Sequence, residues 1–441
     1  MSKSVIIVGA GAAGLACAAD LAREGFGVTI LEGRDRIGGR IFSQPVQGLA
    51  APVELGAEFI HGEAPQIFEP MKRAREEIVE GSGDDWCKEE GELCACDFFE
   101  KVDELLDKMK QHGSPDRSFS TFLKQLPREQ GDENIRLRAL EYVSGFNAAD
   151  PDKISVRSLI TDMARSEELG GDRILRLRNG YAALVSWLKN ECTRSAVEIR
   201  TDHAVRRVAY GSDRVLISGN HFREEFHLEA DAAVVTVPAS LLQGASAASI
   251  TFDPVLPSSK LEALRSTALG PVIRVVLVFQ QPFWHALKGS GGRSLSKLRF
   301  LFSHDPFFPT WWTQHPVKSP VLVAWSSGPR ARQFDGWAKP RILEQALSSL
   351  ANILPISKSE LTQLFREGFM HDWQADAFSL GAYSYLCVGA AEAPAELARA
   401  IGNKLFFAGE ATNGMGDHGT VHGAMESGHR AAREIKAVLK E

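Results

Sequence analysis

Residues 5–14 read VIIVGAGAAG, and this stretch decides the fold of the chain. The apolar run from Val5 to Val8 predicts a parallel strand that is covered on both faces. Three glycines follow at the spacing that permits a tight turn, a close approach of backbone to phosphate, and close packing of a helix on the strand. The predicted cofactor contacts of this turn are Gly9, Gly11, Ala13 and Gly14.

The residues after the turn complete a strand–turn–helix–strand unit. Apolar residues recur at helical spacing from Leu15 to Ala22, and a second strand is predicted over 28–31. That strand ends in Glu32, whose carboxylate can accept hydrogen bonds from ribose hydroxyls. A glycine-rich turn without a ligand is the alternative, but the complete unit favours a dinucleotide with its diphosphate at the helix N-terminus. The unit leaves open whether that dinucleotide is NAD or FAD.

Two further glycine-containing regions extend the predicted cofactor site. Residues 34–40 (RDRIGGR) combine arginines, which can pair with a diphosphate, and a Gly-Gly backbone that can lie against a flat ring system. Near the C-terminus, residues 405–410 (LFFAGE) form an apolar run that ends in glycine and an acid, and residues 419–428 (GTVHGAMESG) follow. We therefore expect both ends of the chain to hold one long cofactor.

Together with residues 54–62 (ELGAEFIHG), these motifs resemble the FAD-binding signature of the flavin-containing amine oxidases. Further matches, in the family's order, are 179–184 (NGYAAL), 230–238 (ADAAVVTVP), 281–284 (QPFW), Trp373 and 381–385 (GAYSY). The resemblance implies FAD as the cofactor. Besides Glu32 and the first turn, the contacts it implies are Arg34, Gly39, Arg40, Gly56, Ala57, Glu58, Phe59, Val205, Trp373, Gly409, Glu410, Thr420 and Val421.

The same resemblance implies the residues around the reacting centre. The sequence Thr-Val-His-Gly from Thr420 is similar to that of polyamine oxidases and of the lysine-specific histone demethylase. Tyr383 would form one aromatic wall of the substrate site, and Thr420 would stand where monoamine oxidases have the second wall. His61 matches a histidine at the substrate entrance. A histidine titrates near neutral pH, so His61 could favour the neutral amine, or it could only hydrogen-bond a loop.

Two departures from the family pattern affect the chemistry. Ala382 replaces the cysteine that monoamine oxidases bond to the flavin, so FAD is expected to bind without a covalent link. Arg274 replaces the lysine that holds a water near the flavin, and strand alternation places it on one face with Val272 and Val276. Arginine is bulkier, forked and always protonated. The change raises the alternative of a dehydrogenase, although Arg274 could also hold the same water.

The predicted function is therefore an FAD-dependent amine oxidase acting on a primary or secondary amine, with polyamines among the candidates. Hydride transfer to the flavin would give an imine that hydrolyses, and O2 would be reduced to H2O2. The predicted catalytic residues are Arg274, Tyr383, Thr420 and His61. Three alternatives stay open: an amine dehydrogenase with another electron acceptor, a desaturase of a non-amine substrate, and a flavoprotein scaffold that does not turn over.

The chain length favours two domains, because 441 residues exceed one ordinary core. We predict an α/β fold with a Rossmann-like FAD-binding domain formed by residues 1–75, 175–260 and 395–441. A substrate-binding α+β domain would comprise 76–174, expected to be helical and charged, and 261–394, with strands at 272–279 and 321–325 and a helix near 342–353. Trp311 and Trp312 would be core residues or further walls of the site.

Composition excludes several classes of protein. A net charge of −6 without a basic face argues against nucleic-acid binding, and no apolar run is long enough to span a bilayer. The start of the chain lacks a secretory pattern, so a cytoplasmic location is expected. The six cysteines lack metal-site spacing and are expected to be reduced thiols. Residues 76–107 are strongly acidic, either as a solvated surface or as a mouth that attracts cationic amines.

Overall fold

The computed structural model describes residues 3–96, 98–112, 115–127, 132–211, 213–244 and 246–440. A five-stranded parallel sheet brings the two ends of the chain together, in the order β10-β2-β1-β14-β23. Its strands are β1 (Ser4–Val8), β2 (Gly27–Leu31), β10 (Glu198–Arg200), β14 (Ala232–Val235) and β23 (Leu405–Phe407). The apolar run that predicted β1 is buried on both faces.

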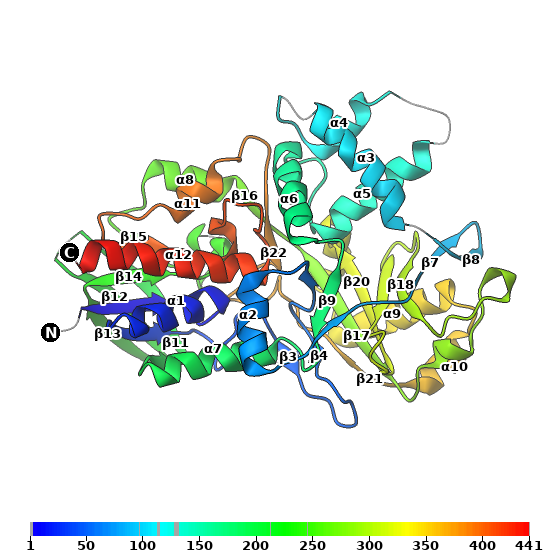
Figure 1. Ribbon diagram of the computed structural model, residues 1–441, viewed down its shortest axis with the longest axis horizontal. Helices are drawn as coiled ribbons and strands as arrows, with labels where there is room; N and C mark the ends of the chain where they lie inside the picture. Colours follow the sequence, from blue (N-terminus) through cyan, green and yellow to red (C-terminus); the bar gives the residue numbers. More distant parts are fainter. Residues whose placement is uncertain are drawn as a thin grey trace.

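Helices from both chain ends cover this sheet. The helices α1 (Ala12–Arg23) and α12 (Val421–Leu439) lie side by side, as Figure 1 shows, and α7 (Ala182–Arg194) also packs on α1. The contact between α1 and α12 is close because Gly428 has no side chain: a Cβ atom there would lie 2.3 Å from the carbonyl oxygen of Ala13. The C-terminal helix is therefore part of the same packing unit as the first strand.

Smaller sheets extend this half of the molecule. A four-stranded sheet has the order β13-β12-β11-β15. Its strands are β11 (His203–Ala209), β12 (Val215–His221), β13 (Glu224–Ala230) and β15 (Thr251–Asp253). A three-stranded sheet joins β5 (Ile60–His61), β9 (Ile174–Leu177) and β6 (Ile78–Glu80), while β3 (Ser43–Gln44) pairs with β4 (Val53–Glu54) and β16 (Thr267–Gly270) with β22 (Tyr383–Leu386).

A seven-stranded sheet forms the other half, in the order β21-β17-β20-β19-β18-β7-β8. Its strands are β7 (Asp84–Glu89), β8 (Glu92–Ala95), β17 (Val272–Phe279), β18 (Leu298–Phe302), β19 (Thr310–Thr313), β20 (Val321–Ser327) and β21 (Phe365–Phe369). All eight residues of β17 are buried because both faces of the sheet are covered. The strands predicted at 272–279 and 321–325 are present.

Alternate residues of β17 belong to two different cores. Val275 and Leu277 pack with α9 (Lys339–Ile353), the helix expected near 342–353. Val276 and Val278 pack with a helical layer on the other face. That layer consists of α3 (Phe98–His112), α4 (Phe119–Gln125), α5 (Asp132–Phe146) and α6 (Val156–Leu169). Arg274 shares the face of Val276, as strand alternation predicted, and its guanidinium contacts Glu58 and Gly56 on that side of the sheet.

The expectation that residues 76–174 are helical is wrong for the first part of that stretch. Residues 78–95 contain the strands β6, β7 and β8, and the turn between β7 and β8 has positive φ at Glu90 (47°) and Gly91 (86°). Five acidic residues between positions 77 and 89 pair with arginines that lie beyond residue 95: Glu77 with Arg178, Glu80 with Arg173, Asp84 with Arg293, Asp85 with Arg299, and Glu89 with Arg138. Asp97 lies outside the described residues. These pairs offset the acidic charge locally.

The expectation that all six cysteines are free thiols is also wrong. The β7–β8 hairpin brings Cys87 and Cys96 together, with Cα atoms 5.7 Å apart, and they form a disulfide. The spacing of cysteines along the sequence did not indicate this disulfide, because Cys87 and Cys96 come together only when the hairpin forms. Cys17, Cys94, Cys192 and Cys387 are free. Among the described helices, none is long and apolar enough to cross a membrane.

Candidate active site

A cavity of about 680 Å³ lies between the two halves of the molecule. It extends from the β1–α1 turn, past the segment 55–61 and strand β17, to helices α5 and α6. The residues that line it range from Val8 to Ala424, so distant parts of the chain contribute to one space. Every predicted site residue except Gly14 lines this cavity.

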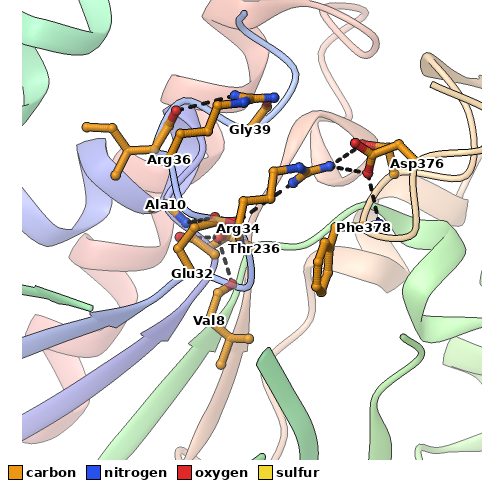
Figure 2. A network of polar contacts seen from close by, with 12 residues as sticks. Val8, Ala10, Glu32, Arg34, Arg36, Gly39, Thr236, Asp376 and Phe378 are labelled. Carbon is orange, nitrogen blue, oxygen red and sulfur yellow. Dashed lines mark hydrogen bonds and ion pairs between the residues drawn. The ribbon is translucent and has the colours of Figure 1, made fainter. Parts of the chain in front are cut away.

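The first end of the cavity is built around Glu32, which is 4% exposed. Its Oε2 atom accepts a hydrogen bond from the backbone N–H of Ala10 at 2.9 Å, and Oε1 accepts one from the N–H of Arg34 at 3.0 Å (Figure 2). Thr236 closes the turn by donating to the carbonyl oxygen of Val8 at 2.9 Å. Glu32 is thus fixed beside the glycine turn, where its remaining lone pairs can still accept hydrogen bonds from hydroxyl groups.

The three glycines of the first turn have different roles. A Cβ atom on Gly14 would lie 2.0 Å from the carbonyl oxygen of Gly9, so Gly14 permits α1 to pack on the turn. Gly9 has a φ of +110°, which disfavours a side chain. A Cβ atom on Gly11 would meet no protein atom within 4 Å, and Gly11 faces the cavity. That open position, at the N-terminus of a 12-residue helix, is where a diphosphate fits.

The predicted phosphate-pairing arginines already have protein partners. Arg34 donates to Asp376 Oδ1 at 2.5 Å (Figure 2). It also donates to Ser379 Oγ at 2.8 Å, and both acceptors lie outside the motif. Arg36 donates to the carbonyl oxygen of Gly39 at 2.9 Å and does not line the cavity. Arg34 and Arg40 line the cavity, so the motif contributes two of its three arginines to the site.

Arg40 connects the N-terminal motif to the C-terminal one. Its Nη1 atom donates to Glu410 Oε1 at 2.9 Å and to the carbonyl oxygen of Ala382 at 2.8 Å. Glu410 also accepts from Ser384 Oγ at 2.5 Å and from the N–H of Gly419 at 2.8 Å. Burial alone would raise the pKa of Glu410, but Arg40 and these hydrogen bonds outweigh it, and the pKa is lowered. The two ends of the chain are therefore joined by an ionised carboxylate.

Arg274 is held by a buried ionic network. Its guanidinium donates to Glu58 Oε2 and to the carbonyl oxygen of Gly56 at 2.7 Å. Glu58 also accepts from Arg176 Nε at 2.8 Å and from Trp312 Nε1 at 3.0 Å. Arg274 is 4% exposed, and its Nε atom has no hydrogen-bond partner among the described residues. Trp312 lines the cavity, whereas Trp311, on the opposite face of β19, is a core residue.

The predicted aromatic wall lies against helix α5. The hydroxyl of Tyr383 donates to the carbonyl oxygen of Phe146 at 2.6 Å, and burial raises the pKa of Tyr383. The hydroxyl of Tyr383 is therefore engaged in a hydrogen bond, and the aromatic ring is the part of this side chain that can face a substrate. Thr420 caps α12: its hydroxyl accepts from the N–H of Gly423 at 3.0 Å and donates to the carbonyl oxygen of Asp417 at 2.6 Å.

His61 lies edge-on to Phe146, with 5.1 Å between ring centroids. Burial, with a smaller contribution from His422, lowers the pKa of His61 to about 4. The expectation that this imidazole titrates near neutral pH is therefore wrong, because its surroundings strongly disfavour the charged form. His61 is a neutral ring in the wall of the cavity.

The remaining predicted residues complete the lining around this network. Trp373 is 3% exposed and donates to the carbonyl oxygen of Leu55 at 2.8 Å, beside Gly56, where a Cβ atom would lie 1.9 Å from the carbonyl oxygen of Arg40. The others that line the cavity are Gly39, Ala57, Phe59, Val205, Gly409 and Val421. Sequence motifs missed the part of the lining from α5 and α6, including Tyr142, Phe146, Asp162 and Ser166. No motif marks these helices.

Comparison with protein families identifies the family of this chain. A model described as flavin containing amine oxidoreductase matches residues 75–436, and a model of an NAD(P)-binding Rossmann-like domain matches residues 7–74. The chain belongs to the flavin-containing amine oxidoreductases. This membership confirms the predicted family, the enzyme class and the flavin cofactor, and the α/β fold with a Rossmann-like unit is confirmed as well.

Two relatives illustrate the range of this family. Polyamine oxidase 3 of Oryza sativa subsp. japonica is 29% identical over 475 residues, which cover 100% of this chain and 90% of the relative. Lysine-specific histone demethylase 1 homolog 2 of the same organism is also 29% identical, over 99% of this chain. The chain spans only 57% of the length of that demethylase homologue.

Two solved structures have the same fold. Wild-type putrescine oxidase bound to putrescine superposes with a TM-score of 0.80 and 21% identity, over 99% of each chain. Cyclohexylamine oxidase from Brevibacterium oxydans IH-35A superposes with a TM-score of 0.79 and 20% identity, over 100% of each chain. At these identities the likeness concerns the fold alone.

Proposed function

We propose that this protein is an FAD-dependent oxidase of primary or secondary amines and that it binds the FAD without a covalent link. The observation that carries the proposal is the single cavity in which the dinucleotide turn, the Arg40–Glu410 pair and the Tyr383 wall meet. When bound, the flavin would supply the hydride acceptor. The residues of this chain would hold and orient the amine and exclude water.

The cavity is suited to a long dinucleotide. The open position at Gly11 and the carboxylate of Glu32 would hold the diphosphate and the ribose. The N-terminus of α12, a 19-residue helix whose Val421 lines the cavity, offers a second set of backbone N–H groups. None of the described residues that line the cavity is a cysteine, and Ala382 stands at the position of the flavin link in monoamine oxidases, which supports non-covalent binding.

The walls near Tyr383 favour an amine in its neutral form. The Tyr383 ring and the neutral His61 ring offer no fixed counter-ion for an ammonium group. Loss of the ammonium proton exposes the nitrogen lone pair, which hydride transfer from the adjacent carbon requires. The imine product would hydrolyse to a carbonyl compound, and O2 would accept the electrons as H2O2.

An amine dehydrogenase is the second candidate, and the geometry of Arg274 favours it. Glu58 and the carbonyl oxygen of Gly56 occupy both terminal nitrogens of the guanidinium. A guanidinium that is held in this way has less freedom to position a water than a lysine would have. On this alternative the reduced flavin would react slowly with O2 and pass its electrons to another acceptor.

One experiment tests both candidates. Purified holoprotein is mixed without oxygen with a panel of primary and secondary amines, the flavin absorbance is followed, and air is then admitted. Bleaching by an amine and rapid recovery in air would support the oxidase. Bleaching with slow recovery would support the dehydrogenase. Absence of bleaching by every amine would contradict both and favour a non-amine substrate or a scaffold.

A further inference from the structure

The acidic residues that line the cavity differ in how their charge is balanced. Glu32, Glu58, Glu141, Glu410 and Asp417 each have an arginine within 4 Å, namely Arg34, Arg274, Arg330, Arg40 and Arg165. The remaining carboxylate of the described lining belongs to Asp162 on helix α6. Among the residues that the structure describes, its one charged partner is His418, with Nδ1 at 3.2 Å from Oδ1, and a histidine carries a full charge only when protonated.

Asp162 is held in a setting that does not stabilise its charge. Its side chain is 20% exposed, and its buried Oδ1 atom accepts no hydrogen bond from any residue in the described part of the chain. Burial raises the pKa of Asp162 to about 6, His418 opposes this shift, and Asp417 adds to it. A buried carboxylate without such support is costly, and it gains most from a cation that arrives with its own charge and N–H donors.

An aromatic surface connects Asp162 with the proposed reacting centre. Tyr383 donates to the carbonyl oxygen of Phe146, whose ring stacks on Tyr142 with centroids 5.3 Å apart. Burial raises the pKa of the Tyr142 hydroxyl, and the charges of Asp103 and Asp162 add to this shift. Tyr142, Phe146 and Leu169 all line the cavity. The cavity therefore has a neutral aromatic end at Tyr383, an apolar middle and a carboxylate beyond it.

We propose that Asp162 and His418 form a second cation subsite, which binds the remote ammonium group of a diamine or polyamine whose first amino group lies beside Tyr383. The methylene chain between the two nitrogens would cover Tyr142 and Phe146. This inference rests on the proposed function and names the substrate class of the same site. A monoamine would leave Asp162 without a cation, so the subsite would select for substrates with two amino groups.

The test compares linear diamines, from propane to octane, with monoamines of the same length. The apparent dissociation constant of each amine is measured from anaerobic flavin reduction. For Asp162→Asn, loss of a charge-assisted hydrogen bond should raise this constant for the best diamine by roughly 10- to 100-fold. The constant for the matched monoamine should change by less than about threefold, because that amine does not reach Asp162. Asp162→Glu should restore part of the diamine preference.

Glu167→Gln provides the matched control. Glu167 lies on the same helix, is 63% exposed and pairs with Lys110, and neither residue lines the cavity. The substitution therefore removes one negative charge from α6 and leaves the residues around Asp162 in place. It should leave the diamine preference unchanged. Equal weakening of diamine and monoamine by Asp162→Asn would mean a structural role for Asp162 and would overturn the subsite. Unchanged constants for both amines would overturn it as well.

A binding measurement separates this inference from the proposed function. Calorimetry on holoprotein whose flavin has been reduced with dithionite reports diamine binding without turnover. If no amine bleaches the flavin but diamines bind and Asp162→Asn abolishes the binding, the proposed function fails and the cation subsite stands. If the reduced wild-type protein binds diamines no better than monoamines, the subsite fails whatever the outcome of the bleaching experiment.

Discussion

Two buried glutamates, four residues apart, show how the surroundings set the charge of a single side chain. Burial raises the pKa of Glu54 to about 7, although Ser43 and the N–H of Tyr181 donate hydrogen bonds to it. Burial acts in the same direction on Glu58, but Arg274 and Arg176 outweigh it, and the pKa of Glu58 is lowered. Glu54 is therefore a hydrogen-bonded acid at mildly acidic pH, whereas Glu58 is an obligatory anion.

The difference predicts that the same substitution costs much more stability at Glu58 than at Glu54. At pH 6, Glu58→Gln should lower the free energy of unfolding by roughly 3–5 kcal/mol, because it leaves two buried arginines without their counter-ion. Glu54→Gln should cost less than about 1 kcal/mol, because it replaces a neutral acid by a neutral amide of similar shape. Urea denaturation of both variants and the wild type, monitored by tryptophan fluorescence, measures the two values.

The pH dependence of the stability of Glu54→Gln tests the protonation state of Glu54. The pKa of Glu54 is raised in the folded state, so between about pH 4.5 and 7 the folded protein binds the proton more tightly than the unfolded chain does. The contribution of this group to stability therefore declines as the pH rises through 7. The deficit of Glu54→Gln relative to the wild type should shrink over the same interval. A deficit that grows with pH would contradict the neutral form of Glu54.

Sequence motifs predicted the cofactor end of the site better than the substrate end. Glu32, Arg40 and Glu410 stand in motifs whose local geometry fixes their position, and all three line the cavity. Strand alternation gave the face of Arg274 but not its partner, because Glu58 lies 216 residues away in the chain. Asp162 has no motif around it, and its missing counter-ion is visible only once α6 is placed beside His418.

At the scale of elements, the β1–α1 turn separates a structural glycine from a cofactor glycine. Gly14→Ala should destabilise the protein by roughly 1–3 kcal/mol, since its Cβ atom would overlap the carbonyl oxygen of Gly9, a backbone atom that cannot move aside easily. Gly11→Ala should leave the apoprotein stability within about 1 kcal/mol, because its Cβ atom meets no protein atom and its φ of −77° suits alanine.

The flavin content of the Gly11→Ala protein tests the cofactor role of this glycine. Gly11→Ala should reduce the ratio of flavin to protein absorbance in the purified protein, because the added methyl group would stand where the diphosphate approaches. Thermal denaturation of the apoproteins, measured beside this ratio, separates the two roles. Full flavin content in Gly11→Ala would show that the diphosphate does not approach the turn at this glycine.

The β7–β8 hairpin shows why an element can be predicted wrongly from its own residues. Residues 84–95 are rich in charge, which is typical of a solvated helix, yet Trp86 and Leu93 are buried. Strand β7 pairs in parallel with β18, more than 200 residues later in the chain, and arginines from other elements balance its acids. These partners are absent from the local sequence, so local pattern alone favoured the helix.

At the scale of the whole molecule, the cavity links cofactor binding to global stability. Its lining includes Val8 and Ala424, and the Arg40–Glu410 pair joins segments 370 residues apart. The order of the five-stranded sheet supports the proposed grouping of 1–75, 175–260 and 395–441 into one discontinuous domain. A ligand that contacts all three segments would favour the folded state of each of them at once.

Removal of FAD should therefore lower the thermal stability of the entire protein. Binding to the folded state alone adds about 2.7 kcal/mol at a free ligand concentration 100 times the dissociation constant. The Tm of the apoprotein should rise with the logarithm of added FAD. FMN should give a smaller rise, because it lacks the adenylate half that Glu32 and the Gly11 turn would hold. If FMN raised the Tm as much as FAD did, the N-terminal turn would contribute nothing to cofactor binding, and the assignment of Glu32 to the ribose would be wrong.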